Sequence, residues 1–239
     1  MLPMIRRFTA SAVGCTISVL LNSGPAYSAQ KDPCPEIDLG LSSTLVALSD
    51  NLIKATTEHE TLLLVGQSPA YLRPLLEKGH RKTIQIAVSR SKPSKTLAPT
   101  EAQQKFYCQY LEKLGVDANL LQNEKLVLID HSFSGKSLGK FAEVLNKCSK
   151  KNVTYRFINF ASAKHIGQHR IHNPDAKLVS TISIFGVPHR QMMTFADELP
   201  RTVPEYPVEL WTKFPDPSIM PEGRACYQKM TKLAENTIF

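Results

Sequence analysis

The segment between Lys125 and Cys148 carries the side chains of this chain that are best placed to do chemistry. It begins with the apolar run LVLI, continues with a short polar loop and ends in a stretch with apolar residues at helical spacing. The loop and the residues after it supply an acid, three hydroxyls, a glycine and a lysine: Asp130, Ser132, Ser134, Gly135, Lys136 and Ser137. Because free N–H groups at a helix start bind anions, this segment predicts an anion-binding site.

Alternating strand and helix patterns indicate which elements position this loop. Apolar runs typical of strands end at Val65 and Ile129, and others occupy 83–89, 153–160 and 178–186. Helical patterns occupy 42–57, a stretch that begins near Pro69, 101–114, 138–145 and 222–235. Thr100 and Gln103 fit a capping box at the start of the helix 101–114. The alternation predicts an α/β fold, with a mostly parallel sheet and helices on both faces.

Two loops lie where such a sheet binds its ligands, which is beyond the carboxyl ends of the strands. One is the GQSP turn after Val65, with Gly66, Gln67 and Ser68 as candidate binding residues. The other is the loop 130–137. We expect both loops to leave the sheet at one edge and to form one site.

Two known motifs match the loop 130–137 only in part. In the phosphate-binding pattern G-x-x-x-x-G-K-[ST], Gly135, Lys136 and Ser137 match, but Asp130 replaces the leading glycine and would repel phosphates. In the hydrolase pattern G-x-S-x-G, Ser132 would be the nucleophile, but Asp130 and Ser134 replace both glycines. The histidine of a hydrolase triad stays open among His165, His169, His172 and His189.

The run LVLIDHSFSGKSL resembles the ribose-phosphate loop of the type I phosphoribosyltransferases. The resemblance implies a phosphoribosyltransferase-like core over about 60–160, in which Asp130 holds ribose hydroxyls. It also implies that the segment from Ser134 to Ser137 binds the 5-phosphate and that VGQSP (65–69) contacts pyrophosphate. The family usually has a second acid where this chain has His131, which weakens both ribose recognition and association with Mg²⁺.

Three functional hypotheses follow from this loop. The first is an exported protein that binds a phosphorylated sugar or nucleotide-like ligand, with phosphoribosyl transfer, and Mg²⁺ as cofactor, implied by the resemblance. The second is a secreted serine hydrolase of the α/β type that uses Ser132. The third is a non-catalytic interaction protein on a decayed enzyme fold, which His131 suggests.

The first 28 residues have the pattern of an export signal. Arg6 and Arg7 precede a 14-residue apolar stretch, and small residues follow at Ala26 and Ser28. We expect cleavage after Ser28 and a periplasmic or secreted protein. Residues 29–239 are then expected to form one α/β domain, with a core at about 60–190 and a C-terminal extension at about 190–239. We expect no stable membrane span, because the apolar stretch is shorter than the ~20 residues that cross a bilayer.

Charge gives limited information about partners. The chain has a net charge of +8, and removal of the signal would leave +6. This balance suits an anionic small molecule, whereas the scattered lysines do not predict nucleic-acid binding. His165, His169 and His172 would lie on one face of a helix, but Gly167 interrupts the pattern, so we predict no metal site.

Four cysteines remain after signal removal: Cys34, Cys108, Cys148 and Cys226. Export to an oxidising compartment predicts one or two disulfides, although spacing does not decide the pairing. For Cys108 and Cys148, which lie on predicted helices, a buried free thiol is the ordinary expectation. Trp211 is expected in the core or in a final strand.

Overall fold

The structure is a computed structural model that describes most of the chain beyond residue 38. The described residues are 39–89, 99–130, 136–149, 153, 155–159, 178–183, 199, 201–204, 206–215 and 219–239. All of them belong to one compact unit, Asp32–Phe239.

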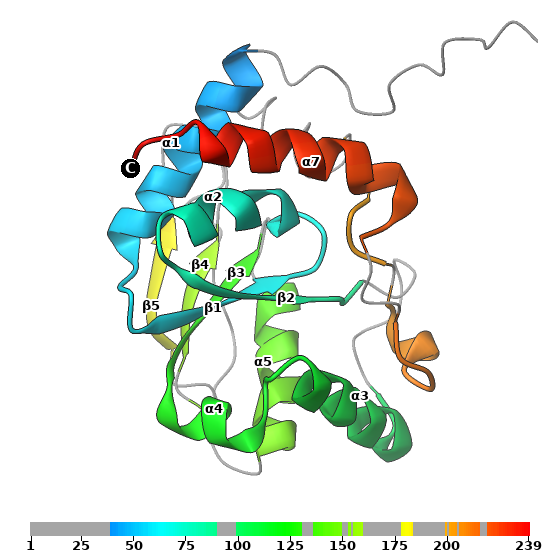
Figure 1. The fold of residues 1–239 in the computed structure, drawn as a ribbon. Helices are drawn as coiled ribbons and strands as arrows, with labels where there is room; N and C mark the ends of the chain where they lie inside the picture. The colour runs from blue at the N-terminus through cyan, green and yellow to red at the C-terminus, as the bar shows by residue number, and fades with distance from the viewer. Residues whose placement is uncertain are drawn as a thin grey trace, which may run out of the picture. The chain divides into compact units, whose positions relative to one another are not determined.

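A five-stranded, all-parallel sheet forms the centre of the molecule (Figure 1). Its strands are β1 (Glu60–Val65), β2 (Lys82–Ile86), β3 (Lys125–Asp130), β4 (Tyr155–Asn159) and β5 (Leu178–Ser183). They are arranged in the order β2-β1-β3-β4-β5, so the chain steps from β1 to one side and then returns to the other. The expected α/β class is therefore confirmed.

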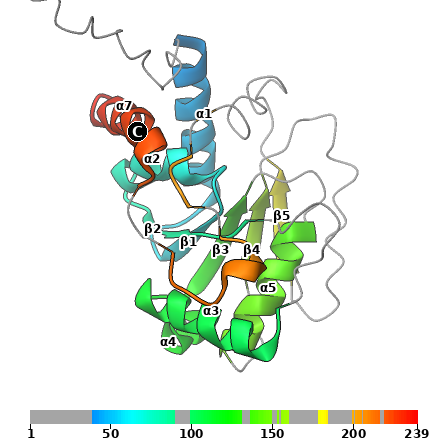
Figure 2. The same cartoon turned by 90° about the vertical axis from the view of Figure 1, so that its right-hand side faces the viewer.

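Helices cover both faces of this sheet (Figure 2). One layer contains α1 (Leu39–Ala55), α2 (Arg73–Lys78) and α7 (Pro221–Glu235). The other contains α3 (Glu101–Lys113), α4 (Ala118–Asn123) and α5 (Lys136–Ser149). Each layer packs against its own face of the sheet, and each interface is a separate hydrophobic cluster.

Strand β1 shows how the two clusters are built. All six of its residues are buried. Leu62 and Leu64 point into the cluster with α1, α2 and α7, whereas Leu63 and Val65 point into the cluster with α3, α4 and α5. Successive strand residues face opposite sides, so an unbroken apolar run is what a strand covered on both faces requires. Burial of each of these leucine side chains contributes about 1.5–3 kcal/mol to the free energy of unfolding.

Local hydrogen bonds explain two helix starts. The capping box of α3 is confirmed: Gln103 N–H donates to Thr100 Oγ1 at 3.3 Å, and Thr100 N–H donates to Gln103 Oε1 at 2.9 Å. Helix α4 did not follow from the sequence patterns. Its cap is Asp117, whose side chain accepts from Leu120 N–H at 2.8 Å. Six residues are too few to show a helical period, so only this cap could have marked the helix.

The segment 206–215 is held to α3 by aromatic side chains. Trp211 is fully buried and stacks on Tyr107 of α3, with 3.8 Å between ring centroids. Its indole N–H donates to the Tyr206 carbonyl at 3.2 Å. The expected core position of Trp211 is therefore confirmed. The alternative of a final strand is wrong, because Trp211 follows a 3-10 turn at Val208–Leu210.

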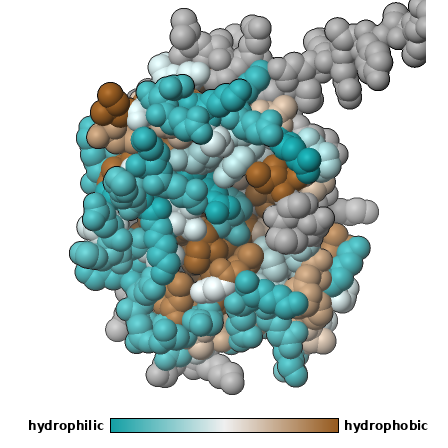
Figure 3. Space-filling model, viewed as in Figure 1, coloured by the Kyte–Doolittle hydropathy of each residue, from teal (hydrophilic) through white to brown (hydrophobic). Residues whose placement is uncertain are grey.

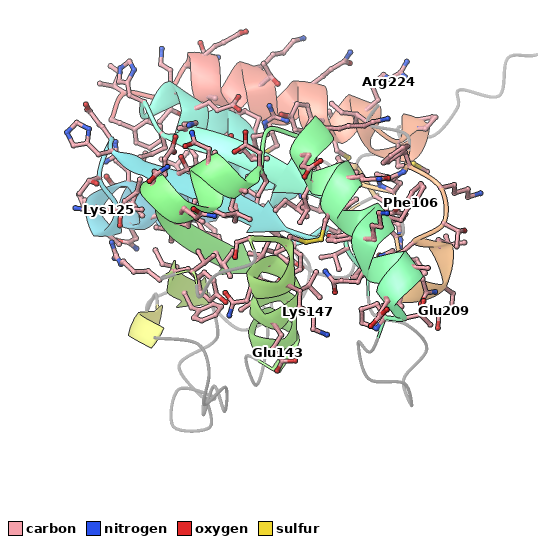
Figure 4. All side chains as sticks on the ribbon, turned by 90° about the horizontal axis from the view of Figure 1, so that it is seen from below. Phe106, Lys125, Glu143, Lys147, Glu209 and Arg224 are labelled. Atoms are coloured by element: carbon pink, nitrogen blue, oxygen red, sulfur yellow. A yellow bond between two sulfur atoms is a disulfide. The ribbon has the colours of Figure 1, made fainter. Side chains whose placement is uncertain are left out.

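A disulfide joins α3 and α5 at Cys108 and Cys148, with 5.2 Å between their Cα atoms (Figure 4). The expectation of free thiols on these helices is wrong, because the packing of the two helices brings both side chains together. An intrachain disulfide was expected, and this pair supplies one. Cys226 is fully buried on α7, and Cys34 lies outside the described residues.

Replacing both Cys108 and Cys148 by alanine is expected to lower the free energy of unfolding by about 3–4 kcal/mol. The bond closes a loop of 40 residues, and that constraint restricts the unfolded chain. Urea denaturation of the wild type and of the double variant measures the difference. Dithiothreitol should destabilise the wild type at least as much as the double substitution does, because Cys226 is also disulfide-bonded and would be reduced as well. A loss below about 1 kcal/mol in the double variant would contradict the expectation.

Candidate functional site

The strand order changes direction at β1 and β3. From β1, the chain moves to β2 on one side and then to β3 on the other. Parallel sheets bind ligands at such a switch point, in the crevice beyond the carboxyl ends of the two strands. Leu64 pairs with Ile129, so Val65 and Asp130 end their strands side by side. The two strands that were expected to share an edge are thus neighbours, and their following loops leave the sheet together.

The turn after β1 depends on Gly66. Its φ angle is +76°, in the left-handed region that side chains disfavour. A Cβ at this position would lie 3.1 Å from the Val88 carbonyl oxygen. The Gly66 N–H donates to the Ile86 carbonyl at 2.9 Å and so extends the pairing of β1 with β2. The geometry of the turn is therefore enough to explain why this position is a glycine.

Gln67, a predicted ligand-binding residue, also holds a distant part of the chain. Its Oε1 accepts from the backbone N–H groups of Thr202 and Val203, at 2.9 and 3.0 Å. Both of those residues are buried. The carboxamide oxygen of Gln67 therefore connects the loop after β1 with the segment 201–204. Ser68, the third candidate in this loop, is half-buried.

Asp130 is the last residue of β3 and is half-buried. Helix α5 begins six residues later, at Lys136. Lys136 and Ser137 are therefore the first two residues of a 14-residue helix, which matches the expected helix start. Ser132, Ser134 and Gly135 lie outside the described residues.

The chemistry of this edge is that of an acid beside a helix N-terminus. The first turn of a helix has N–H groups without intrahelical partners and carries partial positive charge, which favours phosphates and carboxylates. Asp130, at the adjacent strand end, can accept hydrogen bonds from hydroxyl groups. A magnesium ion would need more than this one carboxylate, because Mg²⁺ in such sites is usually completed by substrate phosphates. Asp130 thus suits Mg²⁺ only together with a phosphorylated ligand.

The opposite edge of the sheet, where the strands begin, carries structural ion pairs. Arg156 donates to the buried carboxylate of Glu60 at 2.6 Å. Lys82 bonds to Glu124 at 2.8 Å, and Thr61 also donates to the Glu124 carboxylate. These hydrogen bonds from Lys82 and Thr61 lower the pKa of Glu124. The carboxylates of Glu60 and Glu124 thus stabilise the starts of β1, β2 and β4.

A cavity that sequence reasoning missed lies beside β2. Its volume is about 310 Å³, at the lower end of the range for small-ligand pockets. Its walls include Arg73 of α2, two residues of β2 (Thr83 and Gln85), Leu114 after α3, Thr202 of the segment 201–204, and Tyr227 of α7. The sequence offers one signal for this cavity, which is that polar Thr83 and Gln85 alternate with the apolar Ile84. Such alternation suggests a strand that is not covered on both faces.

Comparison of the sequence with family models and with curated proteins assigns the chain to no family. No protein-family model matches the sequence, and no characterised protein is similar enough to count as a relative. Function must therefore be argued from the site.

Membrane-spanning helices and the histidine cluster also bear on what the protein could bind. Within the described ranges, no helix combines the length and the apolar character that crossing a membrane requires. The three histidines His165, His169 and His172 lie outside those ranges.

The variant Gln67→Ala is expected to lower the free energy of unfolding by about 1–3 kcal/mol, because it leaves two buried N–H groups without their acceptor. Gln67→Glu keeps an acceptor oxygen and should lose less. Urea denaturation followed by the fluorescence of Trp211, the single tryptophan, measures both.

Ser68→Ala, in the same loop, is the matched control and should stay within about 0.5 kcal/mol of the wild type. Equal stability of Gln67→Ala and wild type would show that these hydrogen bonds do not hold the segment 201–204.

Proposed function

We propose that this protein binds a phosphorylated sugar or a nucleotide-like ligand at the carboxyl edge of β1 and β3. The observation that carries the proposal is the position of these strands: they are neighbours at the point where the strand order reverses. The loops singled out by their residue types, 66–69 and 130–137, are the two loops that leave this point. A ligand held by both loops would lie across the switch point.

Each part of the edge has a role in this proposal. The N-terminus of α5, with Lys136 and Ser137 in its first turn, would hold the phosphate through backbone N–H groups and charge. Asp130 would accept hydrogen bonds from sugar hydroxyls. The backbone of the tight turn at Gly66 and the side chain of Ser68 would contact the far end of the ligand, while Gln67 keeps the loop in place.

Transfer of a phosphoribosyl group is the reaction that the resemblance to type I phosphoribosyltransferases suggests for this site. The resemblance includes the core fold, and the parallel sheet with helices on both faces is compatible with it. We also propose that the protein is exported by the signal-like segment 1–28. Ligands of the site would then be phosphorylated compounds outside the cytoplasm.

Saturating phosphoribosyl pyrophosphate or ribose 5-phosphate is expected to raise the melting temperature of the full chain. A ligand at 100 times its Kd stabilises the folded state by about 2.7 kcal/mol, which for this chain length corresponds to a shift of roughly 5–10 °C. Asp130→Asn and Lys136→Ala should each reduce the shift, since they remove a hydroxyl acceptor and a phosphate-binding charge. Differential scanning fluorimetry measures these shifts.

Lys140→Ala is the matched control, because it removes the same charge from the same helix one turn later. Its shift should equal that of the wild type. If Lys140→Ala and Lys136→Ala lose the shift equally, the phosphate does not bind at the helix start. Labelling by a fluorophosphonate that is lost in Ser132→Ala would instead establish a serine hydrolase and end the transferase proposal.

A further inference from the structure

The cavity beside β2 follows the outer edge of the sheet. Strand β2 pairs with β1 on one side and is the first strand in the order, so no described strand pairs with its other side. The cavity has Arg73 and Tyr227 on the side of α2 and α7, and Tyr110 and Leu114 on the side of α3. Figure 3 shows apolar surface near the middle of this face, over β2 and between hydrophilic areas above and below it.

The backbone of β2 presents free hydrogen-bonding groups to this cavity. Ile86 accepts from Gly66 N–H, so its carbonyl points toward β1. In a parallel strand, both backbone groups of a residue point to the same side and the side alternates along the strand. Thr83 and Gln85 therefore direct their N–H and C=O groups outward, where no described residue bonds them. Both residues line the cavity.

The protein itself closes the next part of the same edge. The Ala87 N–H donates to the Tyr110 hydroxyl at 2.9 Å, and the Ala87 carbonyl accepts from the Tyr107 hydroxyl at 3.1 Å. Burial raises the pKa of Tyr110 to about 12, so its hydroxyl keeps its proton at neutral pH. Farther along, Ser89 N–H donates to the Tyr206 carbonyl at 3.2 Å. The open stretch of edge is thus limited to Thr83 and Gln85.

Two buried oxygens of residues that line the cavity have no hydrogen-bond partner in the described part of the chain. They are Gln85 Oε1 and Thr202 Oγ1, and Thr202 is only 4% exposed. The Gln85 amide group cannot simply turn over, because its Nε2 donates to the carbonyls of Leu64 and Gly66 at 2.9 and 2.6 Å. Both oxygens are closed off from solvent, so a ligand in the cavity does not reach them as these side chains lie here.

The cavity combines this polar edge with apolar walls and one positive charge. Ile84 and Leu114 supply apolar surface, while Arg73 is the charged side chain among the described lining residues. Its Nε donates to Glu77 Oε1 at 2.7 Å, and the same oxygen accepts from the Thr83 hydroxyl at 2.7 Å. The two terminal nitrogens of Arg73 bond no other described residue. A carboxylate on the ligand would complement these nitrogens.

We propose that this cavity binds an extended peptide segment that carries an acidic side chain and adds as a strand to the outer edge of β2. Backbone groups of the peptide pair with those of Thr83 and Gln85, and its carboxylate meets Arg73. A cavity of about 310 Å³ suits a short extended segment rather than a folded partner. The site is separate from the carboxyl edge of β1 and β3, because neither Asp130 nor Lys136 lines the cavity.

Selection from a phage-displayed library of linear heptapeptides on the full-length protein tests the proposal. We expect enriched peptides with an Asp or Glu. Synthetic versions, acetylated and amidated at their ends, should bind in isothermal titration calorimetry. Methylation of every second backbone nitrogen in one phase, where the N–H groups face β2, should abolish binding, whereas methylation in the other phase should leave it nearly unchanged.

Thr83→Pro removes one outward N–H and no hydrogen bond to β1, a substitution that an edge strand can accommodate. It should weaken peptide binding roughly three- to tenfold. Thr83→Val is the matched control, because it also loses the threonine hydroxyl but keeps the N–H, and its affinity should stay within twofold. Arg73→Gln should weaken peptides that have an acidic residue and leave their amide analogues unchanged.

A second pair of variants, at Leu114 in the cavity wall, tests the proposal if Thr83→Pro does not fold. Leu114→Glu should lose binding through repulsion of the peptide carboxylate, and Leu114→Met should retain it. Three results would overturn the proposal: no peptide is enriched, the two methylation phases bind alike, or folded Thr83→Pro binds as tightly as Thr83→Val. Because Asp130 and Lys136 are unchanged in these variants, the outcome is independent of the test for a phosphorylated ligand.

Discussion

Burial of the central strands on both faces is the constraint on which the rest of the structure depends. β1 and β3 lie in the middle of the sheet, and the strand interiors are apolar toward both helix layers. Their backbone groups are satisfied by the sheet itself, so a polar side chain in the middle of either strand would lie in the core without water. Chemistry is therefore confined to the strand ends and to the outer edge of the sheet.

The three places where polar groups gather have different roles for this reason. Where the strands begin, the half-buried Arg156 of β4 pairs with the buried Glu60 of β1, and this ion pair connects the two strands across β3. Where they end, Asp130 and the start of α5 lie at the switch point. At the outer edge, β2 keeps two residues open, while tyrosine hydroxyls and the segment around Tyr206 close the rest. The molecule thus covers part of an edge that would otherwise promote aggregation, and leaves a recessed part accessible.

The sequence predicted elements whose signals are local. The uninterrupted apolar run before Gly66 and the capping pair Thr100 and Gln103 need no tertiary information, and both were interpreted correctly. The pairing of Cys108 with Cys148 depends on how two helices pack, which spacing does not encode.

Contacts over long sequence separations were also inaccessible from the sequence. Gln67 and Thr202 are 135 residues apart, and a glutamine in a loop has no feature that names such a partner. The cavity beside β2 was missed because strand order decides which strand is outermost. The residues 131–135 of the candidate site lie outside the described part of the chain.

The two hydrogen bonds of Gln67 give the protein a mechanical connection between distinct regions. This side chain starts from the loop at the switch point and ends on the backbone of Thr202, whose own side chain lines the cavity beside β2. Movement of the segment 201–204 must either pull the loop after β1 or break both bonds. Where the affinities of two ligands, one at each end, both depend on the position of this connection, each ligand will change the affinity for the other by the same factor.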